Sequence, residues 1–298
     1  MTTSLDGRVA IVTGAGAGLG RAEALALADA GARVVLNDLP GGADGTAEEI
    51  RTRGGEASIV PGDVGERATA DAMLAAAVEG FGRLDVVVNN AGVTRDRMLF
   101  NMSDEEWDQV IRIHLRGHFL LSRNAAAHWR SHAKETGRPV TASVVNTASE
   151  AFLSGPPGQA NYGAAKAGIA ALTVSTARAL ASSGVRANAI CPRARTAMTA
   201  DVFGADTSGL DVDPYSPEHV APLVAYLASD AAERITGQVF VVYGGMVALV
   251  APPTVAERFD TAGTRWTADD LDKQLGSYFS DRDPSVGFAA DSIMELTV

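Results

Sequence analysis

Short apolar runs alternate with longer amphipathic segments along the first 250 residues of the chain. Runs such as residues 9–12 and 86–88 contain only apolar side chains, which is typical of strands covered on both faces. The segments between the runs are rich in Ala and Leu and often end in glycine, which predicts helices. We expect strands at residues 9–12, 32–36, 57–60, 85–88, 143–146, 186–190 and 239–242.

Short connections join these elements, so consecutive strands must be parallel, because each helix carries the chain back across the sheet. We therefore predict an α/β fold: a doubly wound parallel sheet of about seven strands with helices on both faces. Residues 1–250 are expected to form one domain. Residues 251–298 form a C-terminal extension with one helix at 267–275, which we expect to pack on the domain or on a neighbouring subunit.

Three polar stretches refine this picture. Residues 103–106 (Ser-Asp-Glu-Glu) form a capping box that opens a long helix. Residues 128–139 are polar and predict a surface loop or a frayed helix end. Residues 199–214 are rich in Gly, Asp and Thr, and a loop of this length is usually a functional lid or disordered.

Charge and cysteine content narrow the possible partners. The net charge of −11 argues against a nucleic-acid or anionic-membrane surface. No apolar run approaches the ~20 residues that a membrane span needs. The single cysteine, Cys191, lies in an apolar run and is expected to be a small core residue. One cysteine cannot form an internal disulfide, which predicts a cytoplasmic protein.

A glycine-rich turn follows the first strand. The pattern is T-G-x-x-x-G-x-G, with Leu19 where the strict G-x-G-x-x-G pattern needs its third glycine. Such glycines let backbone N–H groups approach a phosphate at a helix N-terminus, although many similar sequences are plain tight turns. The second strand ends in Asp38, which could bind both ribose hydroxyls of an adenosine and repel a 2′-phosphate. This acid favours NAD over NADP.

Residues 149–166 hold the main catalytic candidates. Tyr162 and Lys166 are four residues apart at the start of an Ala-rich helix, so they lie on one face. An ammonium group beside a phenol favours the phenolate, which can act as a general base towards an alcohol. Ser149, after an apolar strand, supplies a hydroxyl for the same oxygen. Taken alone, the pair is more often a core tyrosine and a solvated lysine.

Two histidines, His114 and His118, are four residues apart on the long helix and could bind zinc. The nearby sequence has no pattern of acidic partners, so we expect no metal site.

These motifs, in this order and spacing, resemble the short-chain dehydrogenase/reductase family over residues 6–250. The resemblance implies a Rossmann-type sheet, with Tyr162 as proton acceptor and Ser149 holding the substrate oxygen. It implies that Lys166 binds the nicotinamide ribose and lowers the pKa of Tyr162. The cofactor-binding residues that it implies are Gly14, Gly18, Leu19, Gly20, Asp38, Asp63, Val64, Asn90, Ala91, Gly92, Tyr162, Lys166, Pro192 and Thr196.

Two positions depart from the family pattern. His114 stands where many members have an asparagine that anchors a water in a proton relay, so His114 is a further catalytic candidate. Arg193 stands where most members have glycine after Pro192. Residues 35–39 and 113–117 resemble the 3-hydroxyacyl-CoA dehydrogenase unit of type 2 multifunctional enzymes. Residues 191–199 and 258–260 resemble actinobacterial enzymes of steroid degradation, which oxidise 17β-hydroxysteroids, 3-hydroxyacyl-CoA thioesters or both.

The predicted activity is NAD-dependent interconversion of a secondary alcohol and a ketone, with a 17β-hydroxysteroid or a 3-hydroxyacyl-CoA as substrate. An NADPH-dependent reductase of 3-oxoacyl thioesters and a dinucleotide-binding redox sensor are the alternatives. The family pattern also implies a homotetramer or homodimer, paired through the helices that carry Trp107 and Ala171. The substrate is expected to contact an apolar wall formed by Ala151, Phe152, Leu153, Met198, Val202 and Phe203.

Overall fold

The computed structural model describes residues 2–199, 213–261, 263, 265–284 and 287–297. Within them the chain forms an eight-stranded sheet of order β3-β2-β1-β4-β5-β6-β7-β8. The first seven strands are parallel, as predicted. Their bounds, with those of β8, are β1 Val9–Thr13, β2 Arg33–Asp38, β3 Ala57–Pro61, β4 Val86–Asn89, β5 Ala142–Thr147, β6 Val185–Pro192, β7 Val239–Tyr243 and β8 Met246–Leu249.

The eighth strand was not predicted. It pairs antiparallel with β7, with Tyr243 opposite Met246. The two glycines between β7 and β8 make a tight turn. Gly244 has a φ of 51°, a left-handed conformation that glycine adopts without strain, and this reverses the chain.

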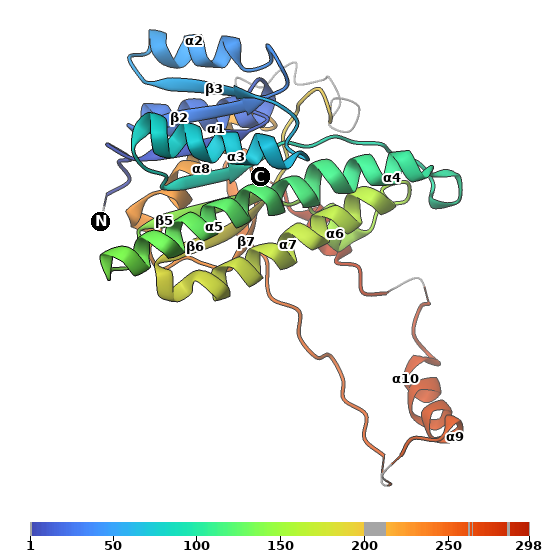
Figure 1. The fold of residues 1–298 in the computed structure, drawn as a ribbon. Helices are drawn as coiled ribbons and strands as arrows, with labels where there is room; N and C mark the ends of the chain where they lie inside the picture. The colour runs from blue at the N-terminus through green and yellow to red at the C-terminus, as the bar shows by residue number, and fades with distance from the viewer. Residues whose placement is uncertain (1, 200–212, 262, 264, 285–286, 298) are drawn as a thin grey trace.

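Helices cover both faces of the sheet, which confirms the predicted layers (Figure 1). On one face, the side chains of Val12 and Val88 pack against α1 (Gly18–Asp29), α2 (Asp44–Thr52) and α8 (Ala221–Ala228). On the other face, Ile11 and Val87 pack against α3 (Arg67–Ala75), α5 (Gly117–Thr136) and α7 (Ala160–Leu180). Helix α4 spans Asp104–Ile111 and α6 spans Ala151–Ser154. None of the helices in the described ranges has the length and hydropathy needed to cross a bilayer.

The capping box at α4 is confirmed: Ser103 Oγ accepts a hydrogen bond from the Glu106 N–H at 3.2 Å, and the Glu106 carboxylate accepts from the Ser103 N–H at 3.0 Å. A π-helical turn at Arg112–Arg116 joins α4 to α5. The expectation of a loop or frayed end from residue 128 was wrong, because α5 continues to Thr136. Trp129 anchors this part: it is 1% exposed, and its Nε1–H donates to the Leu84 carbonyl at 2.7 Å.

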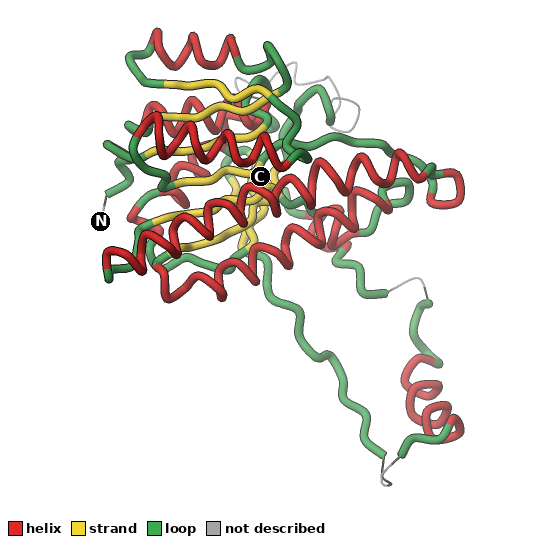
Figure 2. Tube along the Cα trace, viewed as in Figure 1, coloured by secondary structure: helices red, strands yellow, loops and turns green. Residues whose placement is uncertain are grey.

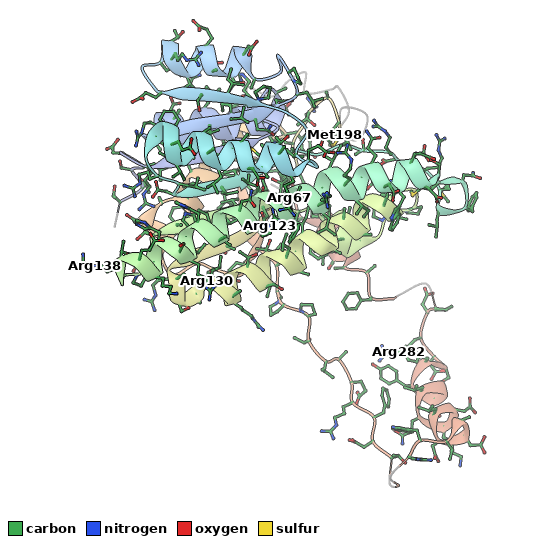
Figure 3. The ribbon with its side chains drawn as sticks, viewed as in Figure 1. Arg67, Arg123, Arg130, Arg138, Met198 and Arg282 are labelled. Atoms are coloured by element: carbon green, nitrogen blue, oxygen red, sulfur yellow. The ribbon has the colours of Figure 1, made fainter. Side chains whose placement is uncertain are left out.

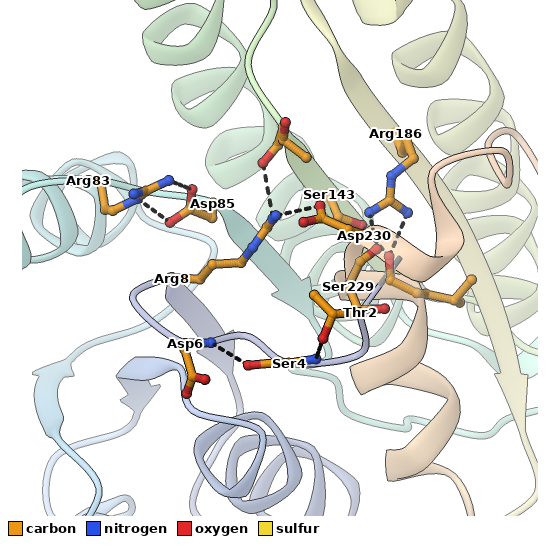
Figure 4. Close-up of polar contacts among 12 residues, drawn as sticks. Thr2, Ser4, Asp6, Arg8, Arg83, Asp85, Ser143, Arg186, Ser229 and Asp230 are labelled. Atoms are coloured by element: carbon orange, nitrogen blue, oxygen red, sulfur yellow. Dashed lines mark hydrogen bonds and ion pairs between the residues drawn. The ribbon is translucent and has the colours of Figure 1, made fainter.

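Polar contacts tie together the end of the sheet where the strands begin (Figure 4). Asp85 accepts hydrogen bonds from the Val9 N–H and from the Arg83 guanidinium. Arg8 pairs with Asp230, and the Arg186 guanidinium donates to the carbonyls at the end of α8. These charged side chains thus have structural partners, which leaves the opposite end of the sheet for a functional site.

The C-terminal extension stands away from the body of the molecule (Figures 1 and 2). After β8 the chain runs out without helix or strand to α9 (Ala268–Leu271), a π-helical turn (Asp272–Gly276) and α10 (Ser277–Phe279). Figure 3 shows Arg282 on this projecting part, far from the arginines along α5. The chain then returns, and the 3-10 turn Asp291–Glu295 contacts α6.

Candidate active site

A cavity of about 560 Å³ opens where the strand order reverses, between β1 and β4. In open α/β sheets this crevice, at the carboxyl ends of the strands, is where ligands bind. The structure brings almost all of the predicted site residues together here. Those that line the cavity are Gly14, Gly18, Leu19, Asp38, Asp63, Val64, Asn90, Ala91, Gly92, His114, Tyr162, Lys166, Pro192 and Thr196. Gly20 and Ser149 are not among the residues that line the cavity.

The glycines of the turn after β1 allow a close backbone approach. A Cβ on Gly20 would lie 2.1 Å from the Gly14 carbonyl oxygen, so no side chain fits there. Gly14 has a φ of 64°, and the Asn90 side-chain amide donates to its carbonyl at 3.3 Å. Gly16 was missed: its N–H donates to Asp38 Oδ2 at 2.8 Å, and a Cβ would collide with that carboxylate. Its place as the second glycine of the turn was the available signal.

The two acids at the strand ends have different partners. Asp38 Oδ1 accepts from the Leu39 N–H at 2.7 Å, so backbone groups orient its carboxylate at the cavity wall. Asp63, which the family resemblance placed among the cofactor-binding residues, is held by Arg112 Nη2 at 2.7 Å and by the Gly65 N–H at 2.7 Å. Burial raises the pKa of Asp63, but these hydrogen bonds outweigh it and leave the pKa below its usual range.

Tyr162, Lys166 and Ser149 meet at the end of β5. Lys166 is 2% exposed, its Nζ donates to the Thr147 carbonyl at 2.6 Å, and Nζ lies 5.3 Å from the centre of the Tyr162 ring. Ser149 lies close enough to the Tyr162 side chain to lower the pKa of the phenol, and its Oγ accepts from the Ala151 N–H at 3.2 Å. The serine and the phenol are therefore placed to hold one oxygen atom between them.

Burial shifts the pKa values of both Tyr162 and Lys166. Burial raises the pKa of Tyr162 to about 12, and the Ser149 side chain only partly opposes this rise. Burial also lowers the pKa of Lys166 to about 7. Loss of solvent around the phenol therefore acts against the lowering of the tyrosine pKa that we expect from Lys166, and that role of Lys166 stays a prediction.

His114 packs against the catalytic tyrosine. The two rings meet edge to face with centres 5.3 Å apart, and His114 Nε2 lies 2.7 Å from the Val93 carbonyl oxygen. A Cβ on Gly92 would lie 2.3 Å from the imidazole, which explains a glycine at this position. Burial, together with the nearby charge of Lys166, holds the pKa of His114 well below its usual range, so the ring is neutral.

His118 lies one turn further along and is also buried. Its pKa is lowered to about 3, chiefly by burial. Among the described residues, no group of three or more His, Cys, Asp or Glu side chains could hold a metal ion.

A second hollow, of about 470 Å³, is mostly apolar and lies against residues 151–152 and the start of α7, although none of Ser149, Tyr162 and Lys166 lines it. Ala151 and Phe152 line it as predicted for a substrate wall, together with Met98 and Phe100, which were missed. The signal was an apolar triplet, residues 98–100, in an otherwise polar loop. Two predicted wall residues lie elsewhere: Met198 lines the first cavity, and the Leu153 carbonyl accepts from the Ala290 N–H at 2.9 Å. Val202 and Phe203 lie outside the described residues.

Glu23 is a second residue that the sequence did not single out. It lies on the buried side of α1 with no exposed surface, and neither carboxyl oxygen has a hydrogen-bond partner within the described residues. Burial raises the pKa of Glu23 to about 8, although Lys166 acts to lower it. An acid at helical spacing among alanines and leucines was the available signal.

Comparisons with known proteins agree with this geometry. Residues 14–247 match the family model described as enoyl-(acyl carrier protein) reductase. Hydroxyacyl-CoA dehydrogenase ChsB1 of Mycobacterium tuberculosis is 59% identical over 98% of this chain and 95% of its own length. Peroxisomal multifunctional enzyme type 2 of Mus musculus is 41% identical over 81% of this chain, which spans 32% of that protein.

A solved structure supports the same assignment. The crystal structure of a short chain dehydrogenase from Mycobacterium avium matches with a TM-score of 0.85 and 44% identity, covering 96% of this chain and 99% of that one. The fold, the cavity and these relatives agree with the motifs in the sequence. The chain is therefore an oxidoreductase and belongs to the short-chain dehydrogenase/reductase family.

Proposed function

We propose that this oxidoreductase uses NAD to interconvert a 3-hydroxyacyl-CoA thioester and its 3-oxo product. The observation that carries the proposal is the meeting of Ser149, Tyr162 and Lys166 at a cavity sized for a dinucleotide. An apolar hollow lies against residues 151–152, which closely follow the serine in sequence. The substrate class is supported by the relative named hydroxyacyl-CoA dehydrogenase, which is similar over almost the whole chain.

The cavity fits a nicotinamide dinucleotide. At Gly14, Gly16 and Gly20 a Cβ atom would collide with neighbouring atoms. The absence of side chains there lets the backbone N–H groups of the turn approach a pyrophosphate. Asp38 lies at the end of the second strand, where an acidic side chain binds the adenosine ribose and disfavours a 2′-phosphate. Arg21, which could bind that phosphate, is paired with Glu49. These features support NAD rather than NADP.

When bound, the nicotinamide supplies the hydride acceptor or donor, and the protein handles the proton and the geometry. In the oxidation direction, Tyr162 takes the hydroxyl proton while the Ser149 hydroxyl holds the same oxygen. A charged Lys166 favours the phenolate and so opposes the effect of burial. Neutral His114 keeps the phenol ring in place by edge-to-face packing and adds no competing positive charge.

The acyl chain is assigned to the apolar hollow. Ala151 and Phe152 lie two and three residues after the serine, and Phe100 and Met98 close the other side. Apolar lining with a few convergent polar groups is typical of small-molecule sites. The thioester end would then leave through the open side of the first cavity, near Arg95.

We also propose a homodimer or homotetramer in the cytoplasm. Trp107 on α4 and Phe119 on α5 are partly exposed on the helices that the family uses for pairing, and their apolar surface supports an interface there. Exposed Leu271 and Phe279 in the projecting part of the extension support its contact with a second copy. The unpaired thiol of Cys191 supports a reducing compartment.

Absorbance of NADH tests the proposed reaction. Purified protein and NAD⁺ are mixed in parallel with a 3-hydroxyacyl-CoA and with a 17β-hydroxysteroid, and we expect turnover with the thioester. Turnover with the steroid alone would show that the substrate is a 17β-hydroxysteroid and not a 3-hydroxyacyl-CoA thioester. Oxidation of NADPH by a 3-oxoacyl thioester, without NAD-linked turnover, would instead favour the reductase. Dinucleotide binding without any turnover would favour the redox sensor.

A further inference from the structure

Arg193 occupies the position after Pro192 at the end of β6, and it is almost completely buried at 8% exposure. Its guanidinium holds the Glu150 carboxylate through two parallel hydrogen bonds, Nε to Oε2 at 2.7 Å and Nη2 to Oε1 at 2.7 Å. Glu150 is 7% exposed and directly follows Ser149. A bidentate pair of this kind fixes the relative positions of the two segments that it joins.

The other donors of the guanidinium bind the end of the chain. Nη1 donates to the Leu296 carbonyl at 2.6 Å, and Nη2 also donates to the Ile293 carbonyl at 2.6 Å. The Tyr243 hydroxyl donates to the same Leu296 carbonyl at 3.0 Å, and its ring lies 4.9 Å from the guanidinium carbon. We call residues 290–297 the C-terminal strap.

The strap also reaches the segment after the serine. The Ala290 N–H donates to the Leu153 carbonyl at 2.9 Å, and the 3-10 turn of the strap contacts α6. Both ends of the strap are therefore attached beside residues 149–154. The contacts join parts of the chain that are more than 100 residues apart in sequence.

A buried ion pair is stable only when its remaining donors and acceptors also find partners. The strap supplies two carbonyl acceptors for Arg193 and removes the pair from water. If the strap left, water would reach both charges, the electrostatic attraction would weaken, and the segment that carries Ser149 would lose a fixed contact. The docking of the strap and the position of the serine are thus linked physically.

We propose that Glu150 and Arg193 are positioning residues that couple the docked C-terminal strap to Ser149, so that full turnover requires the strap in place. The inference rests on the proposed function, because turnover is its readout. It adds a role for residues that contact neither of the two hollows directly. The effect reaches the tyrosine through Ser149, which directly precedes Glu150 and lowers the tyrosine pKa, so a displaced serine no longer does so.

The test compares three variants with the wild-type full-length chain. Arg193→Met removes the donors, and the double variant Glu150→Met/Arg193→Leu removes both charges. An apolar pair of similar volume often leaves stability unchanged, so the double variant is expected to stay folded. Arg138→Met, at the far end of α5 from the extension (Figure 3), is the control for loss of an exposed arginine.

Hydrogen exchange at residues 290–297 reports the strap, and steady-state kinetics report the site. In the double variant we expect faster exchange, unchanged affinity for NAD⁺, and a kcat lowered by about 10- to 100-fold, the cost of a small misplacement of a catalytic group. The kcat profile should also shift to higher pH, which a merely structural loss would not cause. Arg193→Met should have the same effects, and Arg138→Met none.

Two results would overturn the coupling. One is a strap that still exchanges slowly without the ion pair, and the other is a released strap with unchanged kcat and pH profile. Failure of the proposed function gives a different result, because the wild-type chain itself would then show no turnover while its strap remained protected.

Discussion

At the scale of single residues, burial shifts the pKa values of Lys166 and of the ionisable groups around it towards their neutral forms. The pKa of Lys166 is about 7, that of Glu23 about 8 and that of His118 about 3, each shifted mainly by burial. Burying ionisable groups of this kind lowers the free energy of unfolding of the protein, because their charged forms lose contact with water. Residues of this kind are common where a site needs shifted proton affinities, and both Glu23 and His118 interact electrostatically with Lys166.

Glu23 provides a pH-dependent test. Its pKa is raised from an ordinary 4.5 to about 8, so between these values the folded state keeps a proton that the unfolded state has released. The folded state is then destabilised progressively as pH rises from 4.5 to 8. Glu23→Gln removes this penalty, so the variant should gain little at pH 5 and up to a few kcal/mol at pH 8.

Urea unfolding of both proteins at the two pH values measures the difference. Glu48→Gln, on the exposed side of α2, serves as the matched control and should behave like the wild type at both. An equal difference at pH 5 and pH 8 for Glu23→Gln would contradict the assignment of a protonated, buried acid.

At the scale of elements, the sequence predicted the parallel strands because apolar runs with short connections permit few other arrangements. It also predicted most of the cavity lining, because parallel strand ends and the turn after β1 must meet at one edge. The missed parts depend on contacts that are distant in sequence. Helix α5 extends through polar residues because Trp129 donates a hydrogen bond to the Leu84 carbonyl. Arg193 contacts Glu150 and the strap only in the folded chain.

The extended α5 helix is tested at its anchor. Trp129→Phe keeps most of the apolar ring but leaves the buried Leu84 carbonyl without its donor. We expect the free energy of unfolding to fall by about 1–3 kcal/mol, the usual cost of an unpaired buried polar group. Trp107→Phe, on partly exposed α4, should change it much less. Equal unfolding midpoints in urea for the two variants would show that Trp129 does not anchor the helix.

At the scale of the whole molecule, the compact body and the projecting extension differ in how far their apolar side chains are buried. The body buries its apolar residues between sheet and helices, whereas the extension leaves Leu271 and Phe279 exposed. Apolar surface of this kind on an arm that leaves the body is typical of an interaction surface. A second copy of the chain is the partner that the proposed function assigns to it.

The double variant Leu271→Ser/Phe279→Ser tests this assignment, because it keeps the strap and changes only the projecting part. We expect a smaller particle mass by light scattering at the same protein concentration, since the apolar area buried between copies is reduced. Ser280→Ala, on the same projecting part, should leave the mass unchanged. If the double variant has the same particle mass as the wild-type protein, the projecting part of the extension does not contribute to the interface between copies.

The central claim is that Tyr162 exchanges the substrate proton in an alcohol–ketone interconversion, and Tyr162→Phe tests it most directly. The measurement is kcat for NAD⁺-dependent oxidation of a 3-hydroxyacyl-CoA, alongside the affinity for NAD⁺. Loss of the phenol hydroxyl should lower kcat by at least ~10²-fold, the usual size of a general-base contribution, with little change in cofactor affinity. A variant that turns over at nearly the wild-type rate would contradict the account.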